Sequence, residues 1–137
     1  MTETIDRLER MLAEHAIARR IVAFAAANDG HDAQGVAAMF VLEGRFARPT
    51  DPDRPVIGRE AILAFFRDRP ARVTRHVMTN ILVEIDSPDH ARAQSVVTLH
   101  TGERGETVMV GGFSDELVRE ANGEWYFLSR CGSLAFV

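Results

Sequence analysis

Three residues with acid–base side chains stand at the ends of otherwise apolar segments. Asp29 follows an alanine-rich stretch, His76 begins an apolar alternating run, and His100 ends the next such run. A carboxylate bonded to one imidazole nitrogen fixes the tautomer of the ring and raises the basicity of the other nitrogen. That nitrogen can then take a proton next to a carbonyl group or opposite a leaving group. If the fold brings the three together, Asp29 would orient His76 as a base and His100 would protonate a departing hydroxide.

Each of these residues also has an ordinary structural interpretation. Asp29 adjoins a turn glycine, and both histidines could be partly exposed side chains at strand ends. Arg130 is a fourth candidate, within the last apolar alternating run. An inward-facing arginine there would bind an anionic or carbonyl oxygen, whereas an outward-facing one would be a surface cation. The alternation of the sequence fits both orientations.

The elements that must position these residues begin with a long helix. Apolar residues recur at steps of three and four from Ile5 to Phe24, which predicts an amphipathic helix of about 24 residues. The helix would end at residues 28–30, where Gly30 could take the left-handed conformation that commonly ends a helix. Asp29 therefore stands at the predicted end of this helix.

Two shorter helices and a strand follow. Asp32 would cap a second helix over residues 33–40, and residues 42–47 are predicted to form a first strand. A polar loop with three prolines occupies residues 49–55, a composition that is typical of rigid turns. A third helix is predicted over residues 59–68.

From residue 73 the apolar residues recur with a period of two, which is typical of β-strands. Turn sequences that contain Pro, Gly or Asn separate the alternating runs, so the strands should form an antiparallel meander. Four long strands are predicted, over residues 73–85, 91–100, 107–119 and 125–136.

Helices followed by strands indicate an α+β fold rather than an α/β fold. We expect one domain over residues 1–137, with N-terminal helices packed on a strongly curved antiparallel sheet. A long helix laid across a bent sheet leaves a cone with an open end. Side chains on the concave face would then line a hydrophobic pocket for one small molecule.

The composition excludes several classes of partner. The net charge is −4 and charges of both signs are interspersed, so no basic stripe marks a nucleic-acid site. No apolar run approaches the roughly 20 residues that cross a bilayer, and the charged start does not read as a secretory signal. The single cysteine, Cys131, excludes an internal disulfide and suits the reducing cytoplasm. We expect no metal and no cofactor, because metal-binding and phosphate-binding motifs are absent.

Four stretches of the sequence together have the pattern of a known family. They are residues 24–40 around the end of the first helix, 58–62 at the start of the third, 74–76 with 79–80 in a strand, and 123–125 with Arg130 in the last strand. At these stretches the chain resembles SnoaL-like proteins of the nuclear transport factor 2-like superfamily, which form cystatin-like cones. The resemblance spans nearly the whole chain and keeps the order of the motifs.

The sequence most resembles the branch that holds scytalone dehydratase, a bile-acid dehydratase and a lindane dehydrochlorinase. That branch has an Asp at the end of the first helix and a His in the strand motif, and these act as a dyad. Asp29 and His76 match the two positions. His100 matches a second histidine that scytalone dehydratase has on the following strand, and Arg130 resembles a cavity arginine of some members. The resemblance therefore implies that Asp29, His76 and His100 are catalytic.

The sequence departs from this branch where a carbonyl would be held. Members that dehydrate ketones use tyrosines there, but this chain has one tyrosine, Tyr126, and Phe24 stands where some members have a tyrosine. Arg130 and Asn80 could substitute, the substrate could differ, or the pocket could bind a ligand without turnover. The expected substrate-binding residues are Arg130, Phe24, Phe65, Phe66, Met78 and Asn80.

Two functions therefore remain open. The first is a lyase or isomerase, dehydratase-like in its proton abstraction, that acts on a small apolar or cyclic organic molecule. The second is a non-catalytic ligand-binding or assembly module with the same cone. By analogy with the family we also expect a homodimer.

Overall fold

The computed structural model describes residues 5–136, and the two ends of the predicted domain, residues 1–4 and 137, lie outside the described residues. In chain order the elements are α1 (Arg7–Asp29), α2 (Ala33–Ala37), β1 (Phe40–Ala47), β2 (Val56–Ile57), α3 (Arg59–Arg67), β3 (Arg75–Ser87), β4 (His90–Thr101), β5 (Thr107–Arg119) and β6 (Trp125–Leu134). The three helices and the four long strands of the prediction are all present, with ends that differ by a few residues.

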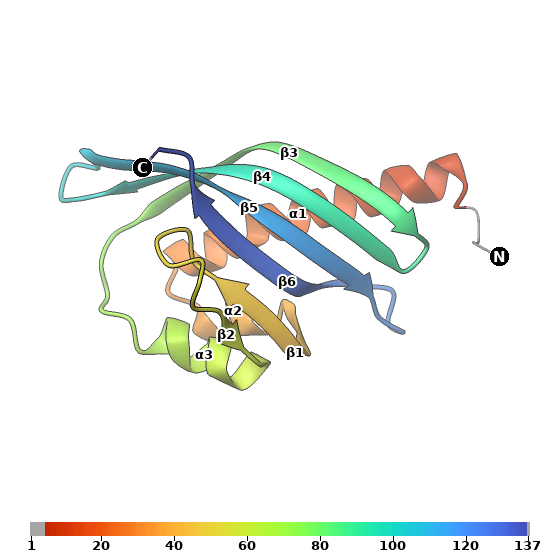
Figure 1. The fold of residues 1–137 in the computed structure, drawn as a ribbon, viewed down its shortest axis with the longest axis horizontal. Coiled ribbons are helices and arrows are strands. Elements are labelled where there is room, and N and C mark those ends of the chain that lie inside the picture. The colour runs from red at the N-terminus through yellow and green to blue at the C-terminus, as the bar shows by residue number, and fades with distance from the viewer. Residues whose placement is uncertain (1–4, 137) are drawn as a thin grey trace.

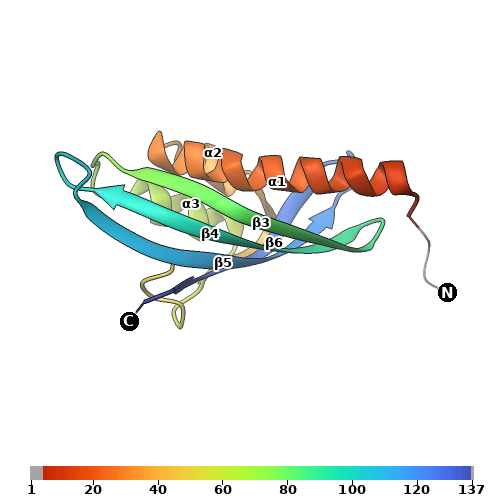
Figure 2. The same cartoon turned by 90° about the horizontal axis from the view of Figure 1, so that it is seen from above.

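One sheet holds all six strands in the order β2-β1-β6-β5-β4-β3 (Figure 1). Strands β3 to β6 form the antiparallel meander that the turn sequences predict. The sequence did not predict that β1 pairs with β6 in the parallel sense, nor that the short β2 pairs with β1. The sheet is curved and unclosed, as Figure 2 shows from above, and the fold is the α+β cystatin-like cone that the resemblance implied.

Helix α1 covers one face of this sheet, and α2 and α3 lie on the same side (Figure 2). Asp6 caps its start by accepting the backbone N–H of Glu9 at 2.7 Å, an interaction that satisfies an otherwise unpaired donor. Ile17, Ile21 and Phe24 point into the core with 0–2% of their surface exposed. Their three- and four-residue spacing places them on one stripe of the helix, which fixes how α1 is rotated against the sheet.

The end of α1 differs from the prediction in which residue is left-handed. Gly30 has a φ of −82° and continues the helix through its N–H bond to Ala26, whereas His31 has a φ of +55°. The N–H of His31 bonds to the carbonyl of Asn28, and the N–H of Asp32 bonds to that of Ala27. This is a Schellman motif with histidine at the left-handed position. The side chain of His31 stabilises it, because Nε2 bonds to the carbonyl of Arg72 at 2.8 Å.

Helix α2 is shorter than the predicted 33–40, because strand pairing takes over its last residues. Asp32 caps it as expected and accepts the N–H of Gly35 at 2.9 Å. The carbonyl of Met39 then accepts the backbone N–H of Phe127 on β6 at 2.8 Å. Phe40 therefore begins β1, and its ring is fully buried.

A cluster of aromatic rings forms the core where α1, α3, β1 and β6 meet. Phe24 lies at its centre, with ring centroids 5.8–6.1 Å from four other rings, mostly edge to face. Edge-to-face contact is a favoured arrangement of aromatic rings and adds to the area that they bury. The four rings around Phe24 belong to Phe40, Phe46, Phe66 and Phe127.

The loop after β1 crosses the sheet where two glycines leave room for it. A Cβ on Gly132 would lie 2.5 Å from the backbone nitrogen of Pro49, and one on Gly111 would lie 3.4 Å from the Cβ of Pro49. Only a residue without a side chain fits against Pro49 at position 132. This close approach sets the path of residues 48–50, which border the cavity described below.

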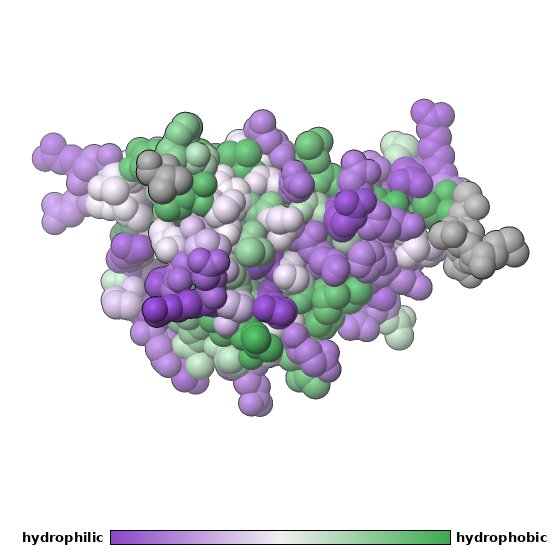
Figure 3. All heavy atoms as spheres, viewed as in Figure 1, coloured by the Kyte–Doolittle hydropathy of each residue, from purple (hydrophilic) through white to green (hydrophobic). Residues whose placement is uncertain are grey.

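The surface of the described chain mixes polar and apolar residues, as the face in Figure 3 shows. Several large apolar side chains of the strands are exposed, namely Leu42, Val77, Leu82, Val108 and Leu134. Among residues 5–136 no helix is long and apolar enough to cross a membrane.

Candidate active site

Asp29 and His76, which match the dyad positions of the family pattern, are in direct contact. Oδ1 of Asp29 lies 2.5 Å from Nδ1 of His76 and also accepts the hydroxyl of Thr74 at 2.9 Å. Oδ2 accepts the backbone N–H of His76 at 2.9 Å. The end of α1 supplies the carboxylate, and the first residues of β3 with their lead-in supply all three groups that bond to it.

The hydrogen-bonding partners define which nitrogen of His76 carries a proton. Asp29 as a carboxylate only accepts hydrogen bonds, so Nδ1 must be the donor and Nε2 carries the lone pair. Nδ2 of Asn28 approaches this Nε2 at 3.5 Å. The amide of Asn28 is oriented by Arg69, whose Nη2 donates to Oδ1 at 2.6 Å. The His76 and Asp29 side chains are 14% and 12% exposed, so the imidazole is largely shielded from water but still reachable.

His76 borders a cavity of about 280 Å³ between the helices and the sheet. Phe65 and Phe66 of α3 line it as predicted, together with apolar side chains from β1, β4 and β5. A cavity of this size suits one small organic molecule with one or two rings. The further apolar residues of its lining are Phe46, Pro49, Val97, Leu99, Met109 and Phe113.

The cavity also has polar residues that the sequence reasoning missed. Asn28, Arg48, Arg69 and Arg72 all line it. Asn28 directly precedes Asp29, so its place at the helix end was a usable signal. The arginines within residues 67–72 look like a solvated charge cluster, and only the fold places two of them beside an apolar cavity.

The structure does not bring His100 into this cavity. Its neighbours Leu99 and Thr101 line the cavity, and alternate residues of a strand point to opposite faces. Nδ1 of His100 instead lies 3.3 Å from the carbonyl of Gly105 in the turn after β4. Each face of the run from 96 to 100 carries a valine, so the prediction did not assign the histidine to the outer face.

Arg130 is turned inward, but it lies beneath the cavity and does not line it. It is fully buried, and its Nη1 bonds to Oδ2 of Asp115 at 2.6 Å. Its guanidinium carbon lies 3.9 Å from the ring centroid of Phe113 and 4.6 Å from that of Phe24, which is cation–π contact. Burial raises the pKa of Asp115 to about 6, although Arg130 acts to lower it. Arg130 therefore forms a core ion pair and lines the second hollow described below, not the cavity at His76.

The other predicted lining residues lie at the margin of the cavity or away from it. Phe24 belongs to the aromatic core below the cavity and is 2% exposed, and Met78 packs against that core while partly buried. Asn80 is exposed, with a φ of +52° where the register of β3 and β4 shifts. A bulge turns its side chain away from the concave face. Tyr126 bonds to Asn122 at 2.8 Å and does not line the cavity.

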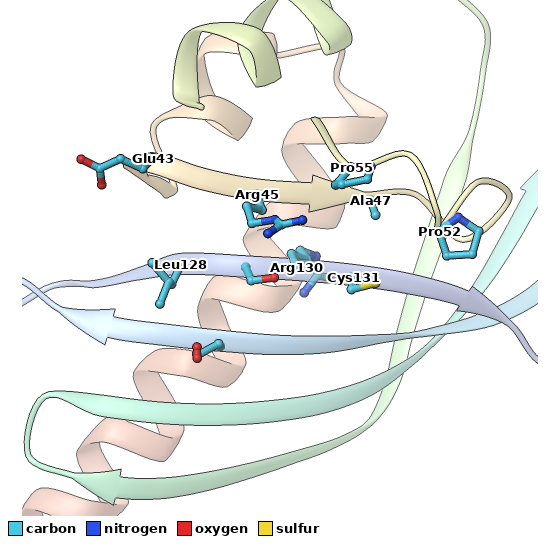
Figure 4. Close-up of a pocket in the computed structure, with 10 residues that line it drawn as sticks. Glu43, Arg45, Ala47, Pro52, Pro55, Leu128, Arg130 and Cys131 are labelled. Atoms are coloured by element: carbon cyan, nitrogen blue, oxygen red, sulfur yellow. The ribbon is translucent and has the colours of Figure 1, made fainter. Parts of the chain in front are cut away.

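A second hollow, of about 370 Å³, lies where β1 and β6 run side by side (Figure 4). It shares no lining residue with the cavity at His76. Its charged side chains include Glu43 and Arg45 of β1, and it contains no histidine. We therefore take the cavity at His76 as the candidate active site, because its lining includes an imidazole that a carboxylate orients.

Among the described residues, no group of three or more His, Cys, Asp or Glu side chains is placed to hold a metal ion. The residues around His76 that could bind a ligand are amide, hydroxyl and guanidinium groups. These are hydrogen-bond donors, which suit oxygen atoms of an organic molecule.

Comparison with solved structures supports the fold. An NTF2-like protein with a cystatin-like fold from Novosphingobium aromaticivorans has a TM-score of 0.83 at 21% identity, covering 95% of this chain and 86% of that chain. A protein of the same organism named after scytalone dehydratase has a TM-score of 0.77 at 22% identity, covering 94% and 91%. A ketosteroid isomerase-like protein from Erwinia carotovora atroseptica has a TM-score of 0.71 at 20% identity, covering 90% and 96%. At these identities the likeness concerns the fold alone.

The sequence comparison identifies the family. No curated protein matches the chain. The model of the SnoaL-like domain matches residues 9–131, which include nearly all of α1, His76 on β3 and most of β6. This chain therefore belongs to the SnoaL-like domain family.

Proposed function

We propose that this chain is a cofactor-independent lyase or isomerase that removes a proton from a small, largely apolar organic molecule. His76 is the base and Asp29 is its positioning residue. The observation that carries the proposal is the contact of Asp29 Oδ1 with His76 Nδ1 at 2.5 Å, beside a cavity of about 280 Å³.

The hydrogen bonds of the dyad support the role of His76. With Nδ1 donating to Asp29, the lone pair lies on Nε2, where it can accept a proton from a carbon next to a carbonyl group. The positive charge that then forms on the ring is stabilised by the carboxylate that already contacts it. Because both oxygens of Asp29 are engaged, one by the backbone of His76, the ring keeps its orientation as the charge changes.

The fate of the proton follows from the position of the histidines. Among the residues that line the cavity, His76 is the only imidazole, and His100 points elsewhere. In a dehydration, His76 would therefore return the proton to the departing hydroxyl, which leaves as water while the C–H electron pair forms the new double bond. In an isomerisation, it would return the proton to another carbon of the same molecule.

Asn28 is our candidate for the group that holds the substrate oxygen in place of the family's tyrosines. Its amide donates toward the cavity side of His76, at 3.5 Å from Nε2, and Arg69 fixes its orientation. A carbonyl oxygen beside this amide would gain a hydrogen bond as negative charge develops on it. The carbon next to that carbonyl would then lie close to Nε2.

Proton abstraction can be measured without knowing the natural substrate. A panel of cyclic ketones and β-hydroxyketones of one and two rings would be followed in D₂O by proton NMR, for exchange of the proton next to the carbonyl and for loss of water. We expect catalysed exchange with at least one member. His76→Gln should slow it about a hundred- to ten-thousand-fold.

Two control variants remove imidazoles that do not touch the cavity. His15→Gln changes an exposed residue of α1, and His100→Ala changes the histidine that points away from the lining. Both should keep the exchange rate of the unchanged chain. Unchanged exchange in His76→Gln, with both controls active, would disprove His76 as the base.

The alternative function is a non-catalytic ligand-binding module with the same fold. The specific observation in its favour is that Asn28 already contacts Nε2 of His76, so the imidazole has partners on both nitrogens without a ligand. If this alternative holds, panel members would bind to the cavity of the chain without substitutions, but their protons would not exchange with D₂O. The same NMR samples distinguish the two functions, because ligand line broadening reports binding and isotope content reports turnover.

A further inference from the structure

Three guanidinium groups line the cavity that contains His76. Arg48 follows β1, whereas Arg69 and Arg72 lie in the connection between α3 and β3. No Asp or Glu is among the residues that line this cavity. None of the three arginines forms an ion pair with a carboxylate within the described part of the chain. The chain as a whole has a net charge of −4, so this local excess of positive charge runs against its overall balance.

Arg69 is the most constrained of the three. Its Nη2 bonds to Asn28, and its guanidinium carbon lies 4.6 Å from the ring centroid of Phe66. Its Nε is buried and has no hydrogen-bond partner among residues 5–136. Burial lowers the pKa of Arg69, the nearby charges of Arg72 and Arg48 lower it further, and the carboxylate of Asp29 acts to raise it. The three like charges around this cavity repel one another, and an anionic ligand would offset that repulsion.

The apolar and cationic parts of the lining lie at different depths. Val97 and Phe113 are buried, whereas Arg48 and Arg72 are exposed. Arg48 also lies 5.8 Å over the ring centroid of Phe65, so the cationic end adjoins the aromatic wall directly. A ligand that fills this cavity would therefore have an apolar body inside and a charged group at the opening.

We propose that the ligand of this cavity is an oxyanion, a carboxylate or a phosphate, carried on an apolar ring system. The guanidinium groups of Arg48, Arg69 and Arg72 donate hydrogen bonds to the oxyanion, and the phenylalanines contact the ring. Guanidinium groups suit this ligand because their planar donors match carboxylate and phosphate oxygens. This inference deepens the proposed function by naming its substrate class, and it rests on that proposal only for the location of the site.

The experiment measures binding and does not require turnover. Isothermal titration calorimetry compares 1-naphthol, 1-naphthoate and 1-naphthyl phosphate, and a second series compares phenol, benzoate and phenyl phosphate. In at least one series we expect an anion to bind about tenfold or more tightly than the neutral phenol. The preference should shrink as NaCl is raised between about 0.05 and 0.5 M. The tighter of the two anions identifies carboxylate or phosphate as the natural group.

Variants then assign the preference to the arginines. The double variant Arg48→Gln with Arg72→Gln alters exposed side chains only, so the protein should fold. This variant should lose most of the anion preference and keep its affinity for the neutral probe. Arg104→Gln makes the same change of charge in the exposed turn between β4 and β5 and should keep the preference. Arg69→Gln should also lose the preference for anions.

The outcomes separate this inference from the proposed function. His76→Gln should keep the anion preference, because the base is not needed for binding, whether or not turnover is found. Equal affinity for anion and neutral probe in both series would overturn the inference. So would the absence of measurable anion binding, or a preference that survives in the Arg48 and Arg72 double variant.

Discussion

Asp29 and His76 are 47 positions apart in the sequence, yet one carboxylate holds both the ring and the backbone of the histidine. The ring bond fixes the tautomer, and the backbone bond fixes where β3 begins relative to the end of α1. Because α1 is anchored to the core through Phe24 and Ile21, the position of the His76 ring is tied to the packing of the whole domain.

Asp29→Asn should damage catalysis more than folding. The amide can replace the acceptor, but its NH₂ group would donate to Nδ1 and place the proton of His76 on Nε2, where the lone pair is needed. We expect the exchange rate to fall about a hundred- to ten-thousand-fold. Steady-state NMR exchange measures this, and circular dichroism shows whether the fold is kept.

Thr74→Val provides a milder variant of the same contact. It removes only the hydroxyl that donates to Asp29 at 2.9 Å, so the tautomer is unchanged. We expect a loss of about tenfold, at the lower end of the roughly 1.5–3 kcal/mol that one hydrogen bond to a charged group is worth. A loss as large as that of Asp29→Asn would contradict a purely positioning role for Thr74.

Arg130→Met should destabilise the protein, because it leaves Asp115 buried without its cation. Breaking a buried ion pair in this way typically costs about 3–5 kcal/mol. Replacing both partners, Arg130→Met with Asp115→Leu, should recover most of that loss, since two apolar side chains of similar volume need no ion pair. Urea unfolding followed by circular dichroism gives the free energy of unfolding of each variant.

The destabilisation by Arg130→Met should depend on pH. Burial raises the pKa of Asp115 to about 6, above that of the unfolded chain. The stability that such a group contributes is present below its unfolded pKa and is lost as pH rises through its folded pKa. Removing Arg130 raises the folded pKa further, so the loss should be smaller at about pH 5 than at about pH 8. An equal loss of stability at both pH values would show that the ionisation of Asp115 does not cause the destabilisation.

Gly132→Ala should disturb the opening of the cavity from the outside. The new methyl group would lie 2.5 Å from the backbone of Pro49, so residues 48–50 must move. We expect a stability loss of about 1–3 kcal/mol from this overpacking, and a weaker preference for anionic ligands because Arg48 moves as well. Thermal unfolding and the naphthoate titration measure the two effects. Gly105→Ala, at a turn outside the cavity, should weaken stability without changing the anion preference.

We further predict a homodimer through the outer face of the sheet, where Val77, Leu82 and Val108 are exposed. A stable dimer covers about 800 Å² or more on each partner, which would remove these side chains from water. Light scattering should give about twice the 15.2 kDa of one chain. Leu82→Glu should shift the mass toward the monomer, and a native chain that is monomeric at working concentration would refute the prediction.

Much of the fold was predictable because it is encoded locally. The spacing of Ile17, Ile21 and Phe24 predicted α1, and the change to a period of two predicted β3 to β6. The pairing of β1 with β6 was not predictable in this way, because it joins segments from opposite ends of the chain. The path from α2 into β1 also depends on that pairing, because the backbone N–H of Phe127 donates to the carbonyl of Met39.

The candidate site was predictable only in part, for a similar reason. The match of Asp29 and His76 to a family pattern located the dyad. His100 and Asn80 were placed on the concave face, but strand alternation and a bulge turn them away. Arg130 was expected to bind an oxygen, but its partner, Asp115, lies on a neighbouring strand that no spacing rule connects to it.

His31 has a further consequence for how a ligand would be received. A histidine at a φ of +55° is costly compared with glycine, yet its ring bonds to the carbonyl of Arg72 at 2.8 Å. The connection that carries Arg69 and Arg72 is therefore restrained before any ligand arrives. The entropy of ordering that segment is lost during folding and not at binding, so more of the contact energy with a ligand is left to set its affinity.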